Sequence, residues 1–290
     1  MALVVFAVCM VSYSGPMVKG ALNEGASPIS VALLRMLAAA LLMLPYEARQ
    51  CVRRHIPMKL TPAQCGLTAL AAAFLAAHYI TWITSLTGTS TFASVALVCT
   101  QPLFVAALSG VVLHEHMPRR AVPGAVVALV GAILIGMSSL TGLSGDVAGD
   151  LLALAGAACM AGHWLCSRYA RRTVEALPYT YLVYGQTALL LALMAPLTGG
   201  FQLTPASLWY ILGLAAGSTL LGHLLFTVAL GRVSATVVSF ALLGEPVGAM
   251  LWSMLMFGEI PTPLLLLGGA VVLAGLGLYS WGSLQRSPEK

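Results

Sequence analysis

The chain has 290 residues, of which 59% are hydrophobic and only 8% are charged. A soluble domain of ordinary composition carries about 25% charged residues, so a water-soluble enzyme is excluded at the outset. The mean hydropathy of +0.93 indicates that lipid is the solvent, and the net charge of +5 needs no nucleic-acid partner because the loops account for it.

Continuous apolar runs predict ten membrane-spanning helices, because a hydrocarbon core of about 30 Å needs roughly 20 helical residues per span. The alternating strands of a membrane barrel are not seen in the sequence. In chain order, the predicted spans are 2–19, 28–46, 63–84, 91–113, 121–139, 149–168, 178–197, 205–229, 234–257 and 263–283. The first lacks a basic start and a small-residue cleavage site, so we interpret it as a retained anchor. The expected fold class is an all-α integral membrane protein.

The distribution of basic residues predicts the orientation of the chain. If the N-terminus is cytoplasmic, every Lys and Arg except Lys19 and Arg35 falls in a cytoplasmic loop or tail. The outer loops hold Lys19 together with Asp146, Asp150 and Glu259. Cytoplasmic loops are enriched in Lys and Arg. We therefore expect a multi-pass protein of the inner membrane with both termini in the cytoplasm.

The second half of the chain repeats features of the first. The tetrapeptide LTPA occurs at 60–63 and at 203–206. At a fixed offset of 144 residues, Pro102 falls on Pro246, Ser109 on Ser253, Glu115 on Glu259, Gly124 on Gly268 and Gly131 on Gly275. Each half has five predicted spans, an odd number, so the halves should insert in opposite directions, as in many secondary transporters. We predict two inverted five-helix repeats, 1–139 and 149–283, which together form one transport domain.

These features resemble a known family of carriers. A P-x(12)-E pattern ends the fourth and ninth spans, the fifth and tenth spans are Gly-rich (GAVVALVGA and GGAVVLAGLG), and an arginine lies early in the second (LLRMLAAALL). Over essentially its whole length, the chain resembles the ten-helix EamA-type branch of the drug/metabolite transporter superfamily. The resemblance implies a carrier that works by alternating access, often an exporter of amino acids or other small metabolites.

Glu245 is the sharpest functional candidate. It lies near the middle of the ninth span, and a charged side chain there costs roughly 2.5–3.5 kcal/mol, so we expect it to face a cavity or a partner. The repeat places Gln101 at the matching depth of the fourth span, and both residues precede a proline. Proline removes a backbone hydrogen bond, so a helix break is expected at both points. The alternative is a neutral Glu245 held by a neighbouring helix.

Arg35 lies about 10 Å from the outer end of the second span. Its guanidinium can bind a carboxylate through two parallel hydrogen bonds. The resemblance places an arginine here in many such carriers regardless of substrate, which favours a structural or gating role. Snorkelling toward the membrane surface is a further alternative.

Histidines within spans, and aromatic residues beside them or related by the repeat, complete the predicted substrate site. A histidine inside a span is more often a hydrogen-bonded packing residue than a substrate ligand. The additional candidates are Tyr13, His78, Trp82, His163, Trp164 and His223.

No Walker A, G-x-S-x-G or paired nucleophile and base is present in the sequence, so neither an enzyme nor a cofactor is expected. The HEH string at 114–116 lacks H-E-x-x-H spacing, and no metal site is expected. The expected function is secondary-active transport of small amino-acid-like or amphipathic metabolites, with export as the favoured direction. The expected partners are the substrate, a proton as candidate coupling ion and the lipid bilayer, for a monomer or homodimer. The alternatives are an importer of an organic cation or another metabolite, and a passive channel.

Overall fold

The computed structural model describes residues 6, 9–54, 61–112, 119–140, 146–170, 173–198, 200–222 and 244–284. The described chain is built from helices, as predicted. In chain order these are α2 (Ser14–Asn23), α3 (Pro28–Arg54), α4 (Pro62–Gly88), α5 (Thr91–Val98), α6 (Gln101–Val112), η1 (Arg119–Ala121), α7 (Val122–Leu140), α8 (Val147–Ala170), α9 (Ala176–Met194), η2 (Ala195–Leu197), α10 (Pro205–Gly213), η3 (Leu214–Gly222), α13 (Gly244–Phe257) and α14 (Pro263–Leu284).

Five stretches of helix in the described chain are long and apolar enough to cross a membrane. They are Pro28–Gln50, Pro62–Gly88, Val147–Ser167, Leu177–Leu197 and Pro205–Gly222. Shorter apolar helices cover Thr91–Val105 and Pro263–Tyr279. Each of the ten predicted spans overlaps a described helix, while the ten crossings themselves stay a prediction.

The repeated LTPA tetrapeptides begin corresponding helices. Thr61 caps α4 and Thr204 caps α10, each accepting a hydrogen bond from the backbone N–H three residues on, with proline at the first helical position. The side chain of the residue three positions after the cap accepts a hydrogen bond from the backbone N–H of the cap residue, which completes a capping box in each helix. Such caps satisfy N–H groups that a helix start leaves without partners.

The fourth predicted span is broken at the expected place. Helix α5 ends at Val98, Cys99 and Thr100 form a turn, and α6 begins at Gln101. Pro102 has no N–H to offer the carbonyl four residues earlier, which favours a break in the helix at this point. The matching break near Pro246 was predicted in the ninth span. Helix α13 begins at Gly244, and the residues just before it lie outside the described chain.

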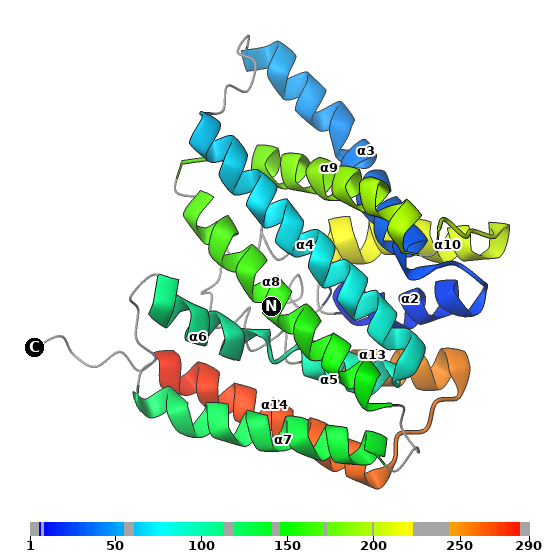
Figure 1. Ribbon diagram of the computed structural model, residues 1–290, viewed down its shortest axis with the longest axis vertical. Coiled ribbons are helices and arrows are strands. Elements are labelled where there is room, and N and C mark those ends of the chain that lie inside the picture. The colour runs from blue at the N-terminus through cyan, green and yellow to red at the C-terminus, as the bar shows by residue number, and fades with distance from the viewer. Residues whose placement is uncertain are drawn as a thin grey trace, which may run out of the picture.

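The helices form a bundle with two apolar cores (Figure 1). One core lies among α2, α3, α4, α9 and α10 and includes fully buried Met36, Ile83 and Leu214. The other lies among α5, α7 and α14 and includes Ile135 and Leu276. In Figure 1, α7 and α14 lie side by side at one edge, and α4 and α8 cross the middle of the bundle.

Helices α7 and α14 pack against each other through the glycines that the repeat places in register. A side chain at Gly131 would collide with the backbone of Val272 and Gly268, and one at Gly275 would collide with the backbone of Ala128. Gly124 meets Gly275 and Tyr279 in the same way, so the helices are antiparallel. Small residues permit this close backbone approach, which accounts for the glycines of these two spans.

Gly131→Leu is expected to lower the free energy of unfolding by about 3 kcal/mol or more, because the new side chain overpacks a backbone contact. Gly185→Leu is the matched control, since a side chain there meets no atom within 4 Å. Melting of the purified proteins would measure the difference. Equal melting temperatures for the two variants would contradict the packing assignment.

Candidate functional site

Arg35 lies about two turns into α3 and is buried, with 2% of its surface exposed. Its Nε donates to Oγ1 of Thr219 at 2.7 Å, and Nη2 donates to Oγ of Ser218 at 3.3 Å. The acceptors lie 184 and 183 residues away in sequence. The guanidinium therefore does not snorkel to the membrane surface but is held inside the bundle.

The two hydroxyls come from η3, a π-helical stretch that continues α10. Its turns are wider than those of an α-helix, and π-helical turns often occur at functional sites. Tyr13 from the first predicted span packs against Gly217, where a side chain would collide with its hydroxyl, and Oη donates to the carbonyl of Gly213 at 2.7 Å. Tyr13 thus braces the segment that presents Ser218 and Thr219.

Aromatic rings of α4 cover the guanidinium. Cζ of Arg35 lies 4.8 Å from the ring centroid of Tyr79 and 5.9 Å from that of Trp82. Both distances fall within the range of a cation–π interaction. His78 stacks on Trp82 at 5.7 Å with an interplanar angle of 11°. We call Arg35, Tyr79, Trp82, Ser218 and Thr219 the central cluster.

Two donors of the central cluster have no acceptor. Nη1 of Arg35 and Nε1 of Trp82 are buried and have no hydrogen-bond partner among the described residues. Buried polar atoms are nearly always paired, and each exception calls for an explanation such as an unseen ligand. Two buried donors in one cluster, one of them charged, are groups that a carboxylate could accept hydrogen bonds from.

Glu245 brings a carboxyl group into the interior of the bundle. It lies in the first turn of α13 and is partly buried. It is near enough to Arg35 for their charges to attract each other, yet among the described residues no hydrogen bond joins the two. Cys99, in the break between α5 and α6, is also near this carboxyl group. A cation and an anion inside the bundle, not directly paired, can hold a molecule that carries both charges.

The histidines of α4 and α8 join those two helices to each other. Nδ1 of His78 lies 2.9 Å from the carbonyl oxygen of Gly156, and Nδ1 of His163 lies 3.0 Å from that of Ala71. The two contacts are reciprocal, because each histidine reaches the backbone of the opposite helix. His163 also places Nε2 3.3 Å from Oγ of Ser167. The polar atoms of His163 are therefore used in packing.

The structure thus brings together five of the nine predicted site residues, namely Arg35, Trp82, Tyr13, His78 and Glu245. Gln101 begins α6 and is partly buried, and it forms no part of the central cluster. Trp164 leaves 44% of its surface exposed and contacts the ring of His163. His223 lies outside the described residues.

Sequence reasoning missed Ser218 and Thr219. The only signal was a pair of hydroxyl residues inside the apolar run LAAGSTLLG. The sequence marks Tyr79 and Tyr184 only as aromatic residues within apolar runs. Tyr184 is partly buried and packs against the same apolar core as Tyr79 and Trp82.

A family model described as the EamA-like transporter family matches the chain twice, over residues 1–137 and 147–281. The chain belongs to this family. The family is of the drug/metabolite transporter type, and its members are multi-pass membrane transporters rather than enzymes. The predicted family is confirmed.

Two proteins that are similar to this EamA-like transporter are themselves named as an exporter and a transporter. A Streptantibioticus cattleyicolor protein named "Probable terminal-alkyne amino-acid exporter" is 28% identical over 276 residues, covering 91% of this chain and 87% of that protein. The Bacillus subtilis "Uncharacterized transporter YwfM" is 28% identical over 261 residues, covering 89% of this chain and 86% of that protein. One crystal structure matches with a TM-score of 0.65 at 17% identity, over 98% of both chains. This last match shows that the fold is shared.

His163→Phe is expected to lower the free energy of unfolding by about 0.6–1 kcal/mol, the worth of an interhelical hydrogen bond in a membrane. Transport kinetics should change less than about twofold, because a packing residue does not contact substrate. Chemical unfolding and initial transport rates measure the two effects. A loss of affinity at unchanged stability would instead place His163 in the substrate site.

Proposed function

We propose that this EamA-like transporter is a secondary-active exporter of amino-acid-like metabolites across the inner membrane. The observation that carries the proposal is the pair of buried donors that have no partner among the described residues, together with the acid Glu245. A substrate carboxylate would bind Nη1 of Arg35 and Nε1 of Trp82, and its ammonium group would lie toward Glu245. Charge-assisted bonds of this kind are roughly twice as strong as neutral ones. Tyr79 and Tyr184 would contact the side chain.

Alternating access would follow from the repeat. In this proposal, residues 1–139 and 149–283 are inverted five-helix repeats that rock around a site near the bilayer midplane. The antiparallel pairing of α7 with α14, the matching caps at Thr61 and Thr204, and two separate family matches support it. Glu245 would carry the coupling proton, and Gln101 would be its uncharged counterpart in the first repeat.

The alternative of an organic-cation importer draws on Glu245 and the surrounding aromatic rings. The central cluster disfavours it, because the guanidinium of Arg35 would repel a substrate that lacks a carboxylate. The relative named an amino-acid exporter also favours the first proposal.

Matched substrates test the proposal. In proteoliposomes, L-leucine should drive counterflow, whereas leucinamide, which lacks the carboxylate, and 4-methylpentanoate, which lacks the ammonium group, should not. A passive channel would show no counterflow at all. Efflux from preloaded cells then gives the direction. Equal counterflow with leucine and leucinamide would refute recognition by Arg35.

The proposed topology places Glu24 outside and Thr173 in the cytoplasm. In a variant without native cysteines, an impermeant maleimide applied to intact cells should label Glu24→Cys and leave Thr173→Cys unlabelled until the membrane is opened. Both positions are exposed in the structure, so access within the protein is equal. Labelling of Thr173→Cys in intact cells would reverse the orientation.

A further inference from the structure

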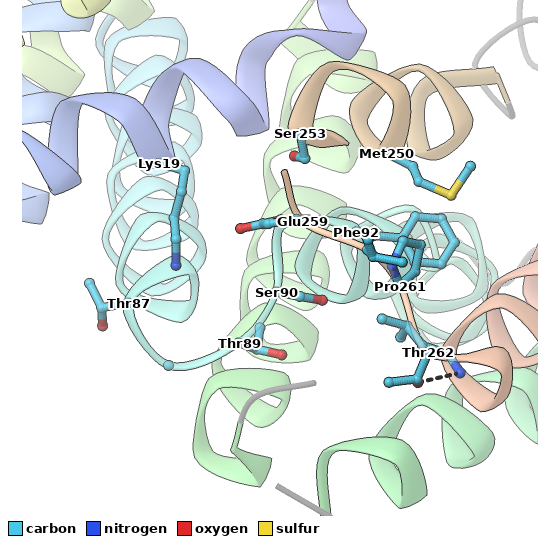
Figure 2. Close-up of a pocket in the computed structure, with 13 residues that line it drawn as sticks. Lys19, Thr87, Thr89, Ser90, Phe92, Met250, Ser253, Glu259, Pro261 and Thr262 are labelled. Carbon is cyan, nitrogen blue, oxygen red and sulfur yellow. Dashed lines mark hydrogen bonds between the residues drawn. The ribbon is translucent and has the colours of Figure 1, made fainter. Parts of the chain in front are cut away.

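A cavity of about 390 Å³ lies at one end of the bundle, where α2, the α4–α5 junction, α13 and the α13–α14 loop meet. We call it the end cavity (Figure 2). Its lining shares no residue with the central cluster among the described residues. The volume lies within the range typical of small-molecule sites, about 300–1,000 Å³. The end cavity is thus large enough for a ligand of its own.

Two opposite charges enter the end cavity from different sides. Lys19 extends from α2, and Glu259 extends from the loop after α13 (Figure 2). Each charged side chain is held by a different partner. Nζ of Lys19 donates a hydrogen bond to the carbonyl of Leu86 at 2.6 Å, and Glu259 accepts a long hydrogen bond from Thr91 at 3.5 Å. The two charges therefore flank the space between them.

A third polar group of the end cavity is unsatisfied. Ser253 lines the cavity, 2% of its surface is exposed, and its hydroxyl has no hydrogen-bond partner among the described residues. Opposite the polar groups, Phe92, Met250 and Leu265 form an apolar wall. A buried hydroxyl without a partner is rare, and here it lies in a cavity that also presents a cation and an anion.

We propose that the end cavity is a second binding site, distinct from the central cluster, for a zwitterionic amino acid with an apolar side chain. Lys19 binds the carboxylate, Glu259 and the hydroxyl of Ser253 bind the ammonium group, and the side chain packs against Phe92 and Met250. A ligand with a single charge would leave one of the two protein charges uncompensated. A zwitterion compensates both.

The role of the end cavity rests on the proposed function. Lys19 and Glu259 belong to the predicted outer loops, so an exported amino acid leaving the central cluster would meet this site last. The binding site itself requires no assumption about direction, and it can be measured with the transporter at rest.

Equilibrium binding of radiolabelled L-leucine to the full chain in lipid nanodiscs tests the inference. The wild type should bind at two sites, and Arg35→Gln should leave one. In the Arg35→Gln background, Lys19→Gln and Glu259→Gln should each weaken binding about tenfold or more, because each removes a charge-assisted hydrogen bond. Glu24→Gln is the control, since this exposed acid at the same end does not line the cavity, and it should leave binding unchanged.

Ligand controls keep the test independent of any one variant. Leucinamide and 4-methylpentanoate should each bind the Arg35→Gln protein at least about tenfold more weakly than leucine does. Ser253→Ala should lower the affinity for leucine severalfold. Saturable leucine binding that is absent from folded Arg35→Gln protein, or insensitive to Lys19→Gln, overturns the inference. Lys19-dependent binding without any Arg35-dependent site would uphold the end cavity and refute the proposed central site.

Discussion

Arg35→Gln is expected to reduce L-leucine counterflow more than about a hundredfold while the melting temperature of the protein changes little. Each hydrogen bond to a charged group is worth about 1.5–3 kcal/mol, and the proposed carboxylate contact uses the charge of Arg35 directly. Among the described residues, Nη1 of the same guanidinium has no hydrogen-bond partner. Removing the buried charge relieves a cost of roughly 2.5–3.5 kcal/mol, which offsets the loss of the bonds that the guanidinium donates to Ser218 and Thr219.

A large loss of transport with little change in stability separates a substrate ligand from a structural residue. If Arg35 served only to hold η3 through Ser218 and Thr219, Arg35→Gln would lower the melting temperature and transport together. Arg35→Lys gives an intermediate control, because it keeps the positive charge but loses the planar fork that binds a carboxylate at two points. We expect Arg35→Lys to retain measurable counterflow. Counterflow of Arg35→Gln equal to wild type would refute the central site.

Glu245→Gln is expected to abolish leucine accumulation driven by a pH gradient while leaving exchange between equal pools partly intact. Glutamine keeps the shape and hydrogen-bonding capacity of the side chain, but it can neither release nor take up a proton. A carrier that couples transport through this acid therefore loses the driving force and keeps the ability to rock with substrate bound. An intramembrane acid facing a cavity is a natural proton carrier.

Proteoliposomes with an imposed pH gradient, compared with equal-pool exchange in the same preparation, measure the two activities. Glu24→Gln removes an exposed acid outside both sites and should behave as wild type. If Glu245 is only a packing residue, Glu245→Gln should be tolerated in both assays. Wild-type proton coupling in this variant would therefore exclude the coupling role.

The features that could be predicted from the sequence are local ones. Hydropathy and helix length give the membrane class and the approximate position of each helix, because a span must satisfy its backbone within itself. The break before Pro102 and the caps at Thr61 and Thr204 follow from the chemistry of one or a few neighbouring residues. The glycine seam of α7 and α14 could be predicted because small residues recur on one helix face.

Which polar side chains meet inside the bundle was decided only by the tertiary structure. Arg35 bonds to Thr219, 184 residues away, while the predicted ligand His163 contacts the backbone of α4 instead. The end cavity likewise joins Lys19 to Glu259 across the whole length of the chain. Membrane helices are apolar over most of their surface, so hydropathy gives the depth of a residue but not the neighbour it faces. That choice depends on side-chain packing and interhelical hydrogen bonds, which exist only once the helices have assembled.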